Sequence, residues 1–390
     1  MQTYDFDQIV DRRGTNCTKW DGMKEVFGRE DLTALWVADM DFKAPPQIIE
    51  ALQNRVEHGI FGYTRYSDGW YDAFIDWVNR RHNWEIERHW ITHSPGIVTA
   101  MALTLKALTE PGDSVVIQPP VYHHFEEQIR LNGREPVLNP LLYKDGRFVM
   151  DLDDLDEKLR GARGLLLCSP HNPAGRVWTE GDLSAVADLC LRHNVILISD
   201  EIHSDVVYSG FRHHPIASLS PEIARRSVTF MAPSKTFNIA GFKTSAVVIP
   251  DADLKARYDR LAEAMSLEGG TCMAVNAFEA AYRYGEPWLK ALLRYLEGNL
   301  DEVETTLRKR IPFITLVRPE GTYVPLVDFR SLKKEPEALQ RFLLDAGVAM
   351  NSGAMFGSGG EGFARLNIAT PRALLREGLD KIVRAVSALR

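Results

Sequence analysis

The feature of the sequence that most constrains its fold is a series of short apolar runs without alternating polar residues. They are "SVVIQPP" (114–120), "GLLLCSP" (164–170), "VILISD" (195–200), "SVTFMAP" (227–233) and "TSAVVIP" (244–250). Segments with helical periodicity lie between several of them, such as "TEGDLSAVADLCLRHN" with Thr179 as its expected N-cap. Strands lose the alternation when helices cover both faces of a sheet. The sequence therefore predicts an α/β fold with a mostly parallel sheet covered by helices on both faces.

The length of the chain and a change in its pattern of apolar and charged residues predict two domains. A chain of 390 residues usually forms two domains, or one large core with a smaller lobe. After about Pro287 the pattern changes to long charged helices, a β-rich piece ("TYVPLVDF", "ARLNIA") and a final helix. We expect a large α/β domain over residues 50–289. The two chain ends, 1–49 and 290–390, are expected to pair as a smaller α+β domain.

Composition narrows the class of protein. The chain is 45% hydrophobic and 25% charged, with a net charge of −7 and no basic block, so no nucleic-acid partner is expected. The longest apolar runs are too short to cross a bilayer, and the polar start does not read as a signal peptide. The four cysteines lie far apart without a CxxC pair, so neither a disulfide frame nor a zinc site is expected. These features favour a reduced, cytoplasmic enzyme.

Polar residues follow the apolar runs where a ligand would bind. In open α/β sheets ligands bind beyond the carboxyl ends of the strands. The residues found there are Tyr122, Asn172, Asp200 with His203, and Lys235. Each alone has a structural explanation, such as a turn, a helix cap or a solvated lysine. Together, an aromatic ring, an amide, a carboxylate and a lysine suit a protonated pyridine aldehyde.

The chemistry of such a cofactor explains each residue type. A carboxylate keeps the pyridine nitrogen protonated, so that the ring can accept the electrons of a carbanion. An aromatic side chain stacks on the ring, an amide binds its phenolic oxygen, and a lysine forms the Schiff base and moves a proton. A phosphate group needs backbone N–H groups at a helix start, and "THSPGIVTAMALTL" supplies one. The cofactor with these groups is pyridoxal 5'-phosphate (PLP).

The sequence resembles the fold-type I PLP-dependent enzymes, and within that aminotransferase superfamily the MalY/PatB-type cystathionine β-lyase (C–S lyase) group. The resemblance runs over essentially the whole chain, and "ADMDF", "SDEIHSD" and "SKTFNIAG" separate this group from ordinary aminotransferases. The segments that carry it are "WVADMDF", "FGYTRY", "QPPVYHHF", "LLCSPHNPAGRVWT", "LISDEIHSDVVY", "APSKTFNIAG", "GEPWL" and "FARLNIATPR".

The resemblance implies roles for five residues. Lys235 would be the catalytic lysine that forms the Schiff base, and Asp200 the partner of the pyridinium nitrogen. Asn172 would donate to the phenolic oxygen and Tyr122 would stack on the ring, both close to the substrate. Arg365 would bind the α-carboxylate of the substrate, for which a planar guanidinium is well suited.

The resemblance also implies a phosphate site and a homodimer. Gly96, Ile97 and Val98 would offer backbone N–H groups to the phosphate at a helix start. Tyr63, in "FGYTRY", would reach across a dimer interface to the phosphate of the partner subunit. A two-fold homodimer is therefore expected.

Two positions depart from the pattern of the superfamily on the phosphate side. A hydroxyl is common three residues before the lysine, but here that residue is Ala232, which leaves Ser234 as the nearer candidate. An arginine is usual eight residues after the lysine, but here it is Lys243, which can neutralise a phosphate as a point charge. His203 is expected near the oxygen side of the ring, or as a satisfied histidine in the pocket wall.

Three other patterns resemble ligand motifs and are assigned to structure. "GSGGEG" (Gly357, Gly359, Gly362) matches a dinucleotide-binding fingerprint, but a strand pattern follows it where a helix is required. "DLDDLDE" lacks the turn glycine of a calcium loop. The adjacent pairs His123–His124 and His213–His214 are expected to diverge and to lack a third ligand, so they are assigned to structure or to the lining of the pocket and no metal site is predicted.

The leading functional hypothesis is β-elimination from a sulfur-containing amino acid such as cystathionine or cysteine, which gives a thiol, pyruvate and ammonia. An aminotransferase would use the same lysine and is the first alternative. A non-catalytic binding protein of the same fold would lack the lysine, which is present as Lys235. A nicotinamide oxidoreductase is disfavoured by the context of the glycine pattern.

Overall fold

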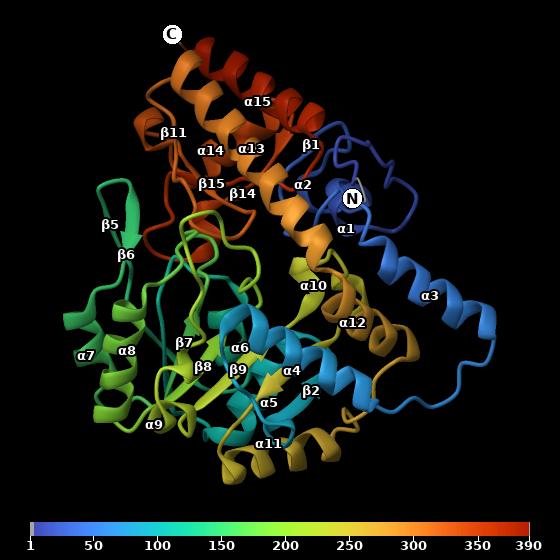
Figure 1. Cartoon of the computed structure of the whole chain (residues 1–390). Coiled ribbons are helices and arrows are strands. Elements are labelled where there is room, and N and C mark those ends of the chain that lie inside the picture. Colours follow the sequence, from blue (N-terminus) through green and yellow to red (C-terminus); the bar gives the residue numbers. More distant parts are fainter. Residues whose placement is uncertain (1–3, 390) are drawn as a thin grey trace.

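The computed structural model describes residues 4–389 and is built around a seven-stranded sheet (Figure 1). Only β10 runs opposite to the other strands, because it pairs antiparallel with both β2 and β9. The prediction of a mostly parallel sheet is therefore confirmed. In spatial order the strands are β2 (Ile91–Ser94), β10 (Ser245–Val248), β9 (Ser227–Met231), β8 (Ile196–Asp200), β7 (Gly164–Cys168), β3 (Ser114–Ile117) and β4 (Glu135–Leu138).

Successive residues of the central strands are buried on opposite faces of the sheet. Leu166 and Ile198 belong to a core with α5 (Ile97–Leu108), α6 (His124–Leu131) and α11 (Ala252–Ala264). Their neighbours Leu165 and Leu197 belong to a second core, with α7 (Leu152–Leu159) and α8 (Glu180–Arg192). Burial on both faces explains why these strands read as unbroken apolar runs.

The expected start of α8 is confirmed in detail. Thr179 is its N-cap and accepts from the backbone N–H of Asp182, whose carboxylate in turn accepts from the backbone N–H of Thr179. This capping box satisfies two N–H groups that the helix itself cannot pair.

The C-terminal part contains a smaller antiparallel sheet. Its strand order is β11 (Thr315–Leu316), β12 (Leu326–Asp328), β15 (Phe363–Arg365) and β14 (Asn351–Ser352). The strands expected in "TYVPLVDF" and "ARLNIA" are longer than those observed. The backbone N–H groups of Leu366 to Ile368 bond instead to carbonyls of residues 325, 35 and 323, so this stretch is buried without continuing the ladder.

The N-terminal segment joins this C-terminal part. β1 (Thr33–Ala34) pairs in parallel with β13 (Val348–Ala349). In Figure 1, α1 (Thr18–Asp21) and α2 (Met23–Phe27) lie beside the red and orange C-terminal elements. The division into a large domain over 50–289 and a small domain from 1–49 and 290–390 stays a prediction. Residues 1–3 and 390 of the small domain lie outside the described residues.

The remaining elements complete the layers. Within residues 4–389, no helix is both long and apolar enough to cross a membrane. The elements are α3 (Pro46–His58), α4 (Asp68–His82), β5 (Leu142–Lys144), β6 (Arg147–Val149), α9 (Pro221–Ala224), α10 (Pro233–Thr236), α12 (Cys272–Tyr284), α13 (Glu286–Arg310), α14 (Pro336–Asp345) and α15 (Arg372–Ser387), with short 3₁₀ turns between some of them.

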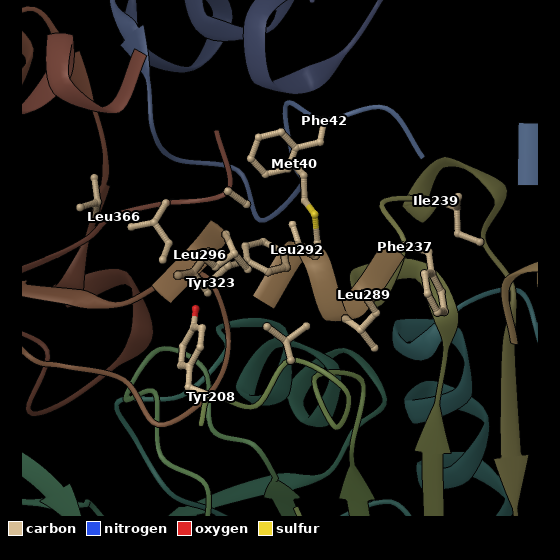
Figure 2. Packing of buried hydrophobic residues seen from close by; sticks show 14 of the residues in the cluster. Met40, Phe42, Tyr208, Phe237, Ile239, Leu289, Leu292, Leu296, Tyr323 and Leu366 are labelled. Atoms are coloured by element: carbon tan, nitrogen blue, oxygen red, sulfur yellow. The ribbon is translucent and has the colours of Figure 1, made fainter. Parts of the chain in front are cut away.

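The turn that carries Lys235 rests on a large shared core. The ring of Phe237 lies 5.7 Å from Trp77, 6.3 Å from Tyr282 and 6.2 Å from Trp288, measured between ring centroids. Figure 2 shows other members of this cluster: Met40 and Phe42 of the N-terminal segment, Ile239 of the turn, Leu289, Leu292 and Leu296 of α13, and Tyr323. Three distant parts of the sequence therefore bury their apolar side chains together beside α10.

A buried carboxylate, Asp205, fixes the other side of the same turn. It accepts hydrogen bonds from Thr236 Oγ1 at 2.9 Å and Trp77 Nε1 at 3.0 Å. It also faces His82 Nε2 at 3.1 Å and the guanidinium of Arg81 at 2.9 Å. Although burial opposes ionisation, these partners lower the pKa of Asp205 to about 2. Asp205 is thus a charged anchor for the residue next to Lys235.

We predict that Asp205→Ala lowers the free energy of unfolding by about 3–5 kcal/mol, because it leaves the charge of Arg81 without its buried partner. Asp205→Asn, which keeps an acceptor for Thr236, should cost less. The folded pKa lies below the ordinary value of 3.8, so the charge stabilises the fold above about pH 4 and this contribution is lost as the pH falls toward 2. Thermal and urea unfolding across this pH range measure both effects.

Asp188→Ala is the matched control, since Asp188 is an exposed carboxylate on α8. It should change the free energy of unfolding by no more than about 0.5 kcal/mol. Equal effects of the Asp188 and Asp205 substitutions would show that Asp205 is not an anchor.

Candidate active site

The loops at one edge of the seven-stranded sheet bring most of the predicted site residues together. The ladder pairs Asp200 with Cys168 on one side and Phe230 on the other, so β7, β8 and β9 end side by side. The residues that converge at this edge are Tyr122 after β3, Asn172 after β7, Asp200 and His203 at and after β8, and Lys235 in α10, with Arg365 from the end of β15.

Asp200 is a buried carboxyl group without a cationic partner. Its Oδ1 accepts from the backbone N–H of Ile202 at 3.1 Å, and within the described residues it forms no ion pair. Burial raises the pKa of Asp200 to about 7, against the lowering effect of that hydrogen bond and of Lys235. A positively charged ring nitrogen at this carboxylate would supply the missing counter-charge.

Lys235 presents its amine to the same pocket. Its Nζ donates a hydrogen bond to the backbone oxygen of Ala38 at 2.8 Å. Desolvation lowers the pKa of Lys235 to about 8, while the Asp39 carboxylate opposes and the Arg365 guanidinium reinforces this shift. The shift increases the unprotonated fraction of this amine near neutral pH, and a nucleophile or a base requires that form.

Arg365 is a buried guanidinium without a carboxylate partner among the described residues. It donates to Asn172 Oδ1 at 3.2 Å, Asn351 Oδ1 at 2.9 Å and the backbone oxygen of Trp36 at 3.0 Å. Among residues 4–389 its Nε has no hydrogen-bond partner, and burial lowers its pKa to about 10. The ring of Phe356 lies 4.8 Å from the guanidinium. Such a group is held in place and lacks only an anion.

Tyr122 and His203 are neutral parts of the pocket wall. Burial raises the pKa of Tyr122 to about 12. Burial, together with the charges of Lys235 and Arg365, lowers the pKa of His203 to about 3. The Nδ1 of His203 has no partner within the described residues, and its ring lies 6.1 Å from that of Tyr323.

The predicted phosphate site is a partly buried helix start with a lysine beside it. Gly96 is the N-cap of α5 with φ +90°, and Ile97 and Val98 open the helix. A Cβ added to Gly96 would lie 4.0 Å from the Cα of Lys243. Because β10 is antiparallel, its start pairs with the end of β2, Ser245 with Ser94, and this brings Lys243 to the helix. Backbone N–H groups and one ammonium group fit an anion.

Two further residues that were expected to bind the cofactor, Ser234 and Tyr63, differ in their burial. Ser234 is buried in α10, whereas Ala232 is the N-cap of that helix. Tyr63 differs from all the others, because its side chain is fully exposed in the single chain. Its predicted role toward a partner subunit therefore stays a prediction.

A segment without an assigned role, residues 36–42 ("WVADMDF"), forms one wall of the site. The oxygen of Ala38 accepts from Lys235 and also from Tyr323 Oη at 3.0 Å. Asn238 Nδ2 donates to the oxygens of residues 40 and 42 at 2.9 and 2.8 Å. Asn367 Nδ2 donates to those of residues 37 and 39. Sequence reasoning missed these roles, because the partners lie about 200 and 330 positions away.

Ion pairs hold the outer side of the 36–42 segment. Arg12 binds Asp39 in a bidentate fashion at 3.0 and 2.7 Å and reaches Asp41 at 2.9 Å. The fully buried Lys19 donates to Asp41 at 2.6 Å. A cleft of about 530 Å³ lined by Arg12, Asp39 and Lys235 lies along this segment.

The structure corrects one expectation about the histidine pairs. The rings of His123 and His124 do not diverge: their centroids are 4.3 Å apart, and Glu127 joins them as a third potential ligand. His213 is structural, since its Nε2 lies 2.8 Å from the buried carboxylate of Glu201. The strand β15 follows the "GSGGEG" loop, which confirms that this is no dinucleotide fingerprint.

Comparison with known proteins agrees with this geometry. The family described as aminotransferase class I and II matches residues 30–382. The chain is 45% identical over 385 residues to cystathionine beta-lyase PatB of Bacillus subtilis (strain 168). The aligned region covers 98% of this chain and 100% of that protein.

Solved structures give the same result. Cystalysin from Treponema denticola, which contains PLP, superposes with a TM-score of 0.97 at 34% identity over 100% of both chains. The PLP-bound C–S lyase from Staphylococcus hominis has a TM-score of 0.93 at 33% identity over 98% of each chain. The chain therefore belongs to the aminotransferase class I and II family, as a PLP-dependent enzyme of its PatB-type cystathionine β-lyase group.

Proposed function

We propose that the protein is a C–S lyase that cleaves the Cβ–S bond of cystathionine or of cysteine-type amino acids by β-elimination. The observation that carries the proposal is a pocket in which Asp200, Lys235 and Arg365 converge, none with an ion-pair partner among the described residues. A protonated pyridine ring, an aldehyde and an amino-acid carboxylate are the groups that would satisfy them. The similarity to a cystathionine β-lyase supports this substrate class.

When bound, PLP supplies a protonated ring that accepts the electrons released at the substrate Cα. Asp200 would keep the ring nitrogen protonated, since a buried carboxylate is stabilised by a cation at hydrogen-bond distance. Tyr122 would cover the ring face, and Asn172 would donate to the phenolic oxygen through its Nδ2, because its Oδ1 already accepts from Arg365. Gly96, Ile97, Val98, Ser234 and Lys243 would hold the phosphate.

Lys235 and Arg365 act on the substrate itself. Arg365 binds the α-carboxylate and thereby fixes the orientation of Cα. Lys235 would hold the cofactor through its Nζ before substrate binds, and as a free amine this Nζ would take the Cα proton of the bound substrate. The Cβ–S electrons then leave with sulfur, which gains a proton as the thiol. Water hydrolyses the remaining aminoacrylate to pyruvate and ammonia.

A product assay distinguishes β-elimination from transamination. Purified holoenzyme incubated with cystathionine should release homocysteine and pyruvate in equal amounts, and Lys235→Ala should abolish both while the chain stays folded. An aminotransferase would use the same residues but return the proton to the cofactor side. Accumulation of the keto acid of cystathionine and of aminated cofactor without thiol would therefore overturn the lyase proposal.

Arg365→Lys tests the carboxylate site. The substitution keeps the charge but removes the planar fork, and hydrogen bonds to charged groups contribute about 1.5–3 kcal/mol. We expect kcat/KM for cystathionine to fall by roughly 10- to 100-fold, mainly through KM, with PLP still bound. Arg318→Lys, at an exposed arginine paired with Asp301, is the control. An unchanged KM in the Arg365 variant would exclude this role.

We further propose a homodimer in a cytoplasmic setting. Tyr63 and its neighbours Ile60 and Phe61 are exposed in the single chain at 112%, 67% and 57%, and such an apolar loop suits an interface. Tyr63 would donate to the phosphate held by the partner subunit. The four cysteines are free thiols, the state that a reducing compartment maintains.

Tyr63→Phe tests the shared site. Loss of one hydroxyl donor to a phosphate should weaken PLP retention by roughly tenfold, with unchanged secondary structure and thermal unfolding. Release of PLP during dialysis, followed by its absorbance, measures this. Tyr284→Phe, at another exposed tyrosine, is the control. Equal PLP retention in both variants, or a monomer in sedimentation analysis, would remove the argument for a shared site.

A further inference from the structure

The start of α6 gathers three metal-binding side chains beside the active site. The nearest potential ligand atoms of His123, His124 and Glu127 all lie within 4.8 Å of one another. His124 and Glu127 share a helix face because they are three residues apart, and His124 Nδ1 is hydrogen-bonded to the Glu127 carboxylate. His123 is the N-cap residue, so its ring turns toward theirs without belonging to the helix.

One nitrogen of this group lacks a partner. The Nδ1 of His123 is shielded from solvent and forms no hydrogen bond within the described residues. A ring nitrogen without a protein partner is free to accept a metal ion. A neutral imidazole is the form that binds metal ions. His124 and Glu127 are partly exposed, so an ion can reach them from solvent.

The group opens onto the substrate side of the site. A cleft of about 360 Å³ is lined by Tyr122, His123, Glu127, Met355 and Phe356. The ring of Phe356 contacts the guanidinium of Arg365, and its centroid lies 6.3 Å from that of His123. An ion bound here would therefore lie one side chain away from the proposed carboxylate site.

We propose that His123, His124 and Glu127 form a binding site for a divalent transition-metal ion, Zn²⁺ in particular, at the rim of the active site. Imidazole and carboxylate donors suit Zn²⁺, whose tetrahedral coordination is met by two nitrogens, one oxygen and a fourth ligand from solvent or substrate. Three protein ligands leave one coordination position, and two of the three, His123 and Glu127, line the cleft. Water fills that position, or a thiolate from the cleft displaces it, since sulfur is a preferred zinc ligand.

The test measures zinc binding to PLP-loaded protein, independently of turnover. Holoenzyme is freed of metals by dialysis against a chelator and titrated with Zn²⁺ against a chromophoric indicator. We expect one Zn²⁺ per chain at micromolar concentration, with affinity at least roughly tenfold lower for His124→Gln and for Glu127→Gln. Glu126→Gln, one residue away on the same turn, removes an equal charge from a carboxylate paired with Arg130 and should bind zinc like the wild type.

Cobalt identifies the ligands in the same protein. Co²⁺ should give tetrahedral ligand-field bands without a thiolate charge-transfer band, and an added thiol without an amino group, 3-mercaptopropionate, should introduce that band. The PLP absorbance of each variant shows that its site is folded. Absence of micromolar zinc binding overturns the proposal. So does binding that persists in the Glu127 and His124 variants, or that disappears only when Cys17 and Cys272 are alkylated.

Discussion

The rest of the structure depends on keeping three ionisable side chains, Asp200, Lys235 and Arg365, in one pocket where none of the described residues forms an ion pair with them. An unpaired buried charge opposes folding, so the surrounding fold must supply the stability. It does so with one apolar core on each face of the sheet and a third core that includes residues from both chain ends. The same unpaired groups can bind a cofactor and a substrate that carry the complementary charges. The binding groups at this edge of the sheet therefore lower the stability of the fold, and the surrounding apolar cores compensate for that loss.

The position of Lys235 shows how that support is built. Its helix α10 is only four residues long and cannot hold a position by itself. Asp205 binds Thr236 from one side, and Phe237 is packed among large aromatic rings on another. The 36–42 segment closes the third side, where the Ala38 oxygen accepts from the amine. The segment is itself held by residues from both halves of the chain. The position of the lysine therefore depends on packing between parts of the chain that are distant in sequence.

Much of the architecture could be predicted because it follows from local pattern. Runs without alternation identified the buried strands, and Thr179 identified the start of α8. The direction of β10 could not be predicted, because a strand buried on both faces has the same composition whichever way it runs. That direction brings Lys243 to the start of α5. The pairing of His123 with His124 was misjudged for a related reason: the side-chain directions of adjacent residues depend on where the helix begins.

The sequence by itself determined the α/β class, the residue types at the strand ends and, through its motifs, the family. These depend on composition, period and spacing, which are properties of neighbouring residues. Only the tertiary structure decided that Arg365 has no carboxylate partner in the described part of the chain, that the Ala38 oxygen accepts from the Lys235 amine, and that Glu127 lies beside two histidines. Charge state and hydrogen bonding depend on which distant groups share a buried volume, and burial changes the energy of an ion far more than its sequence neighbours do. The chemistry of this pocket is therefore a property of the packed chain.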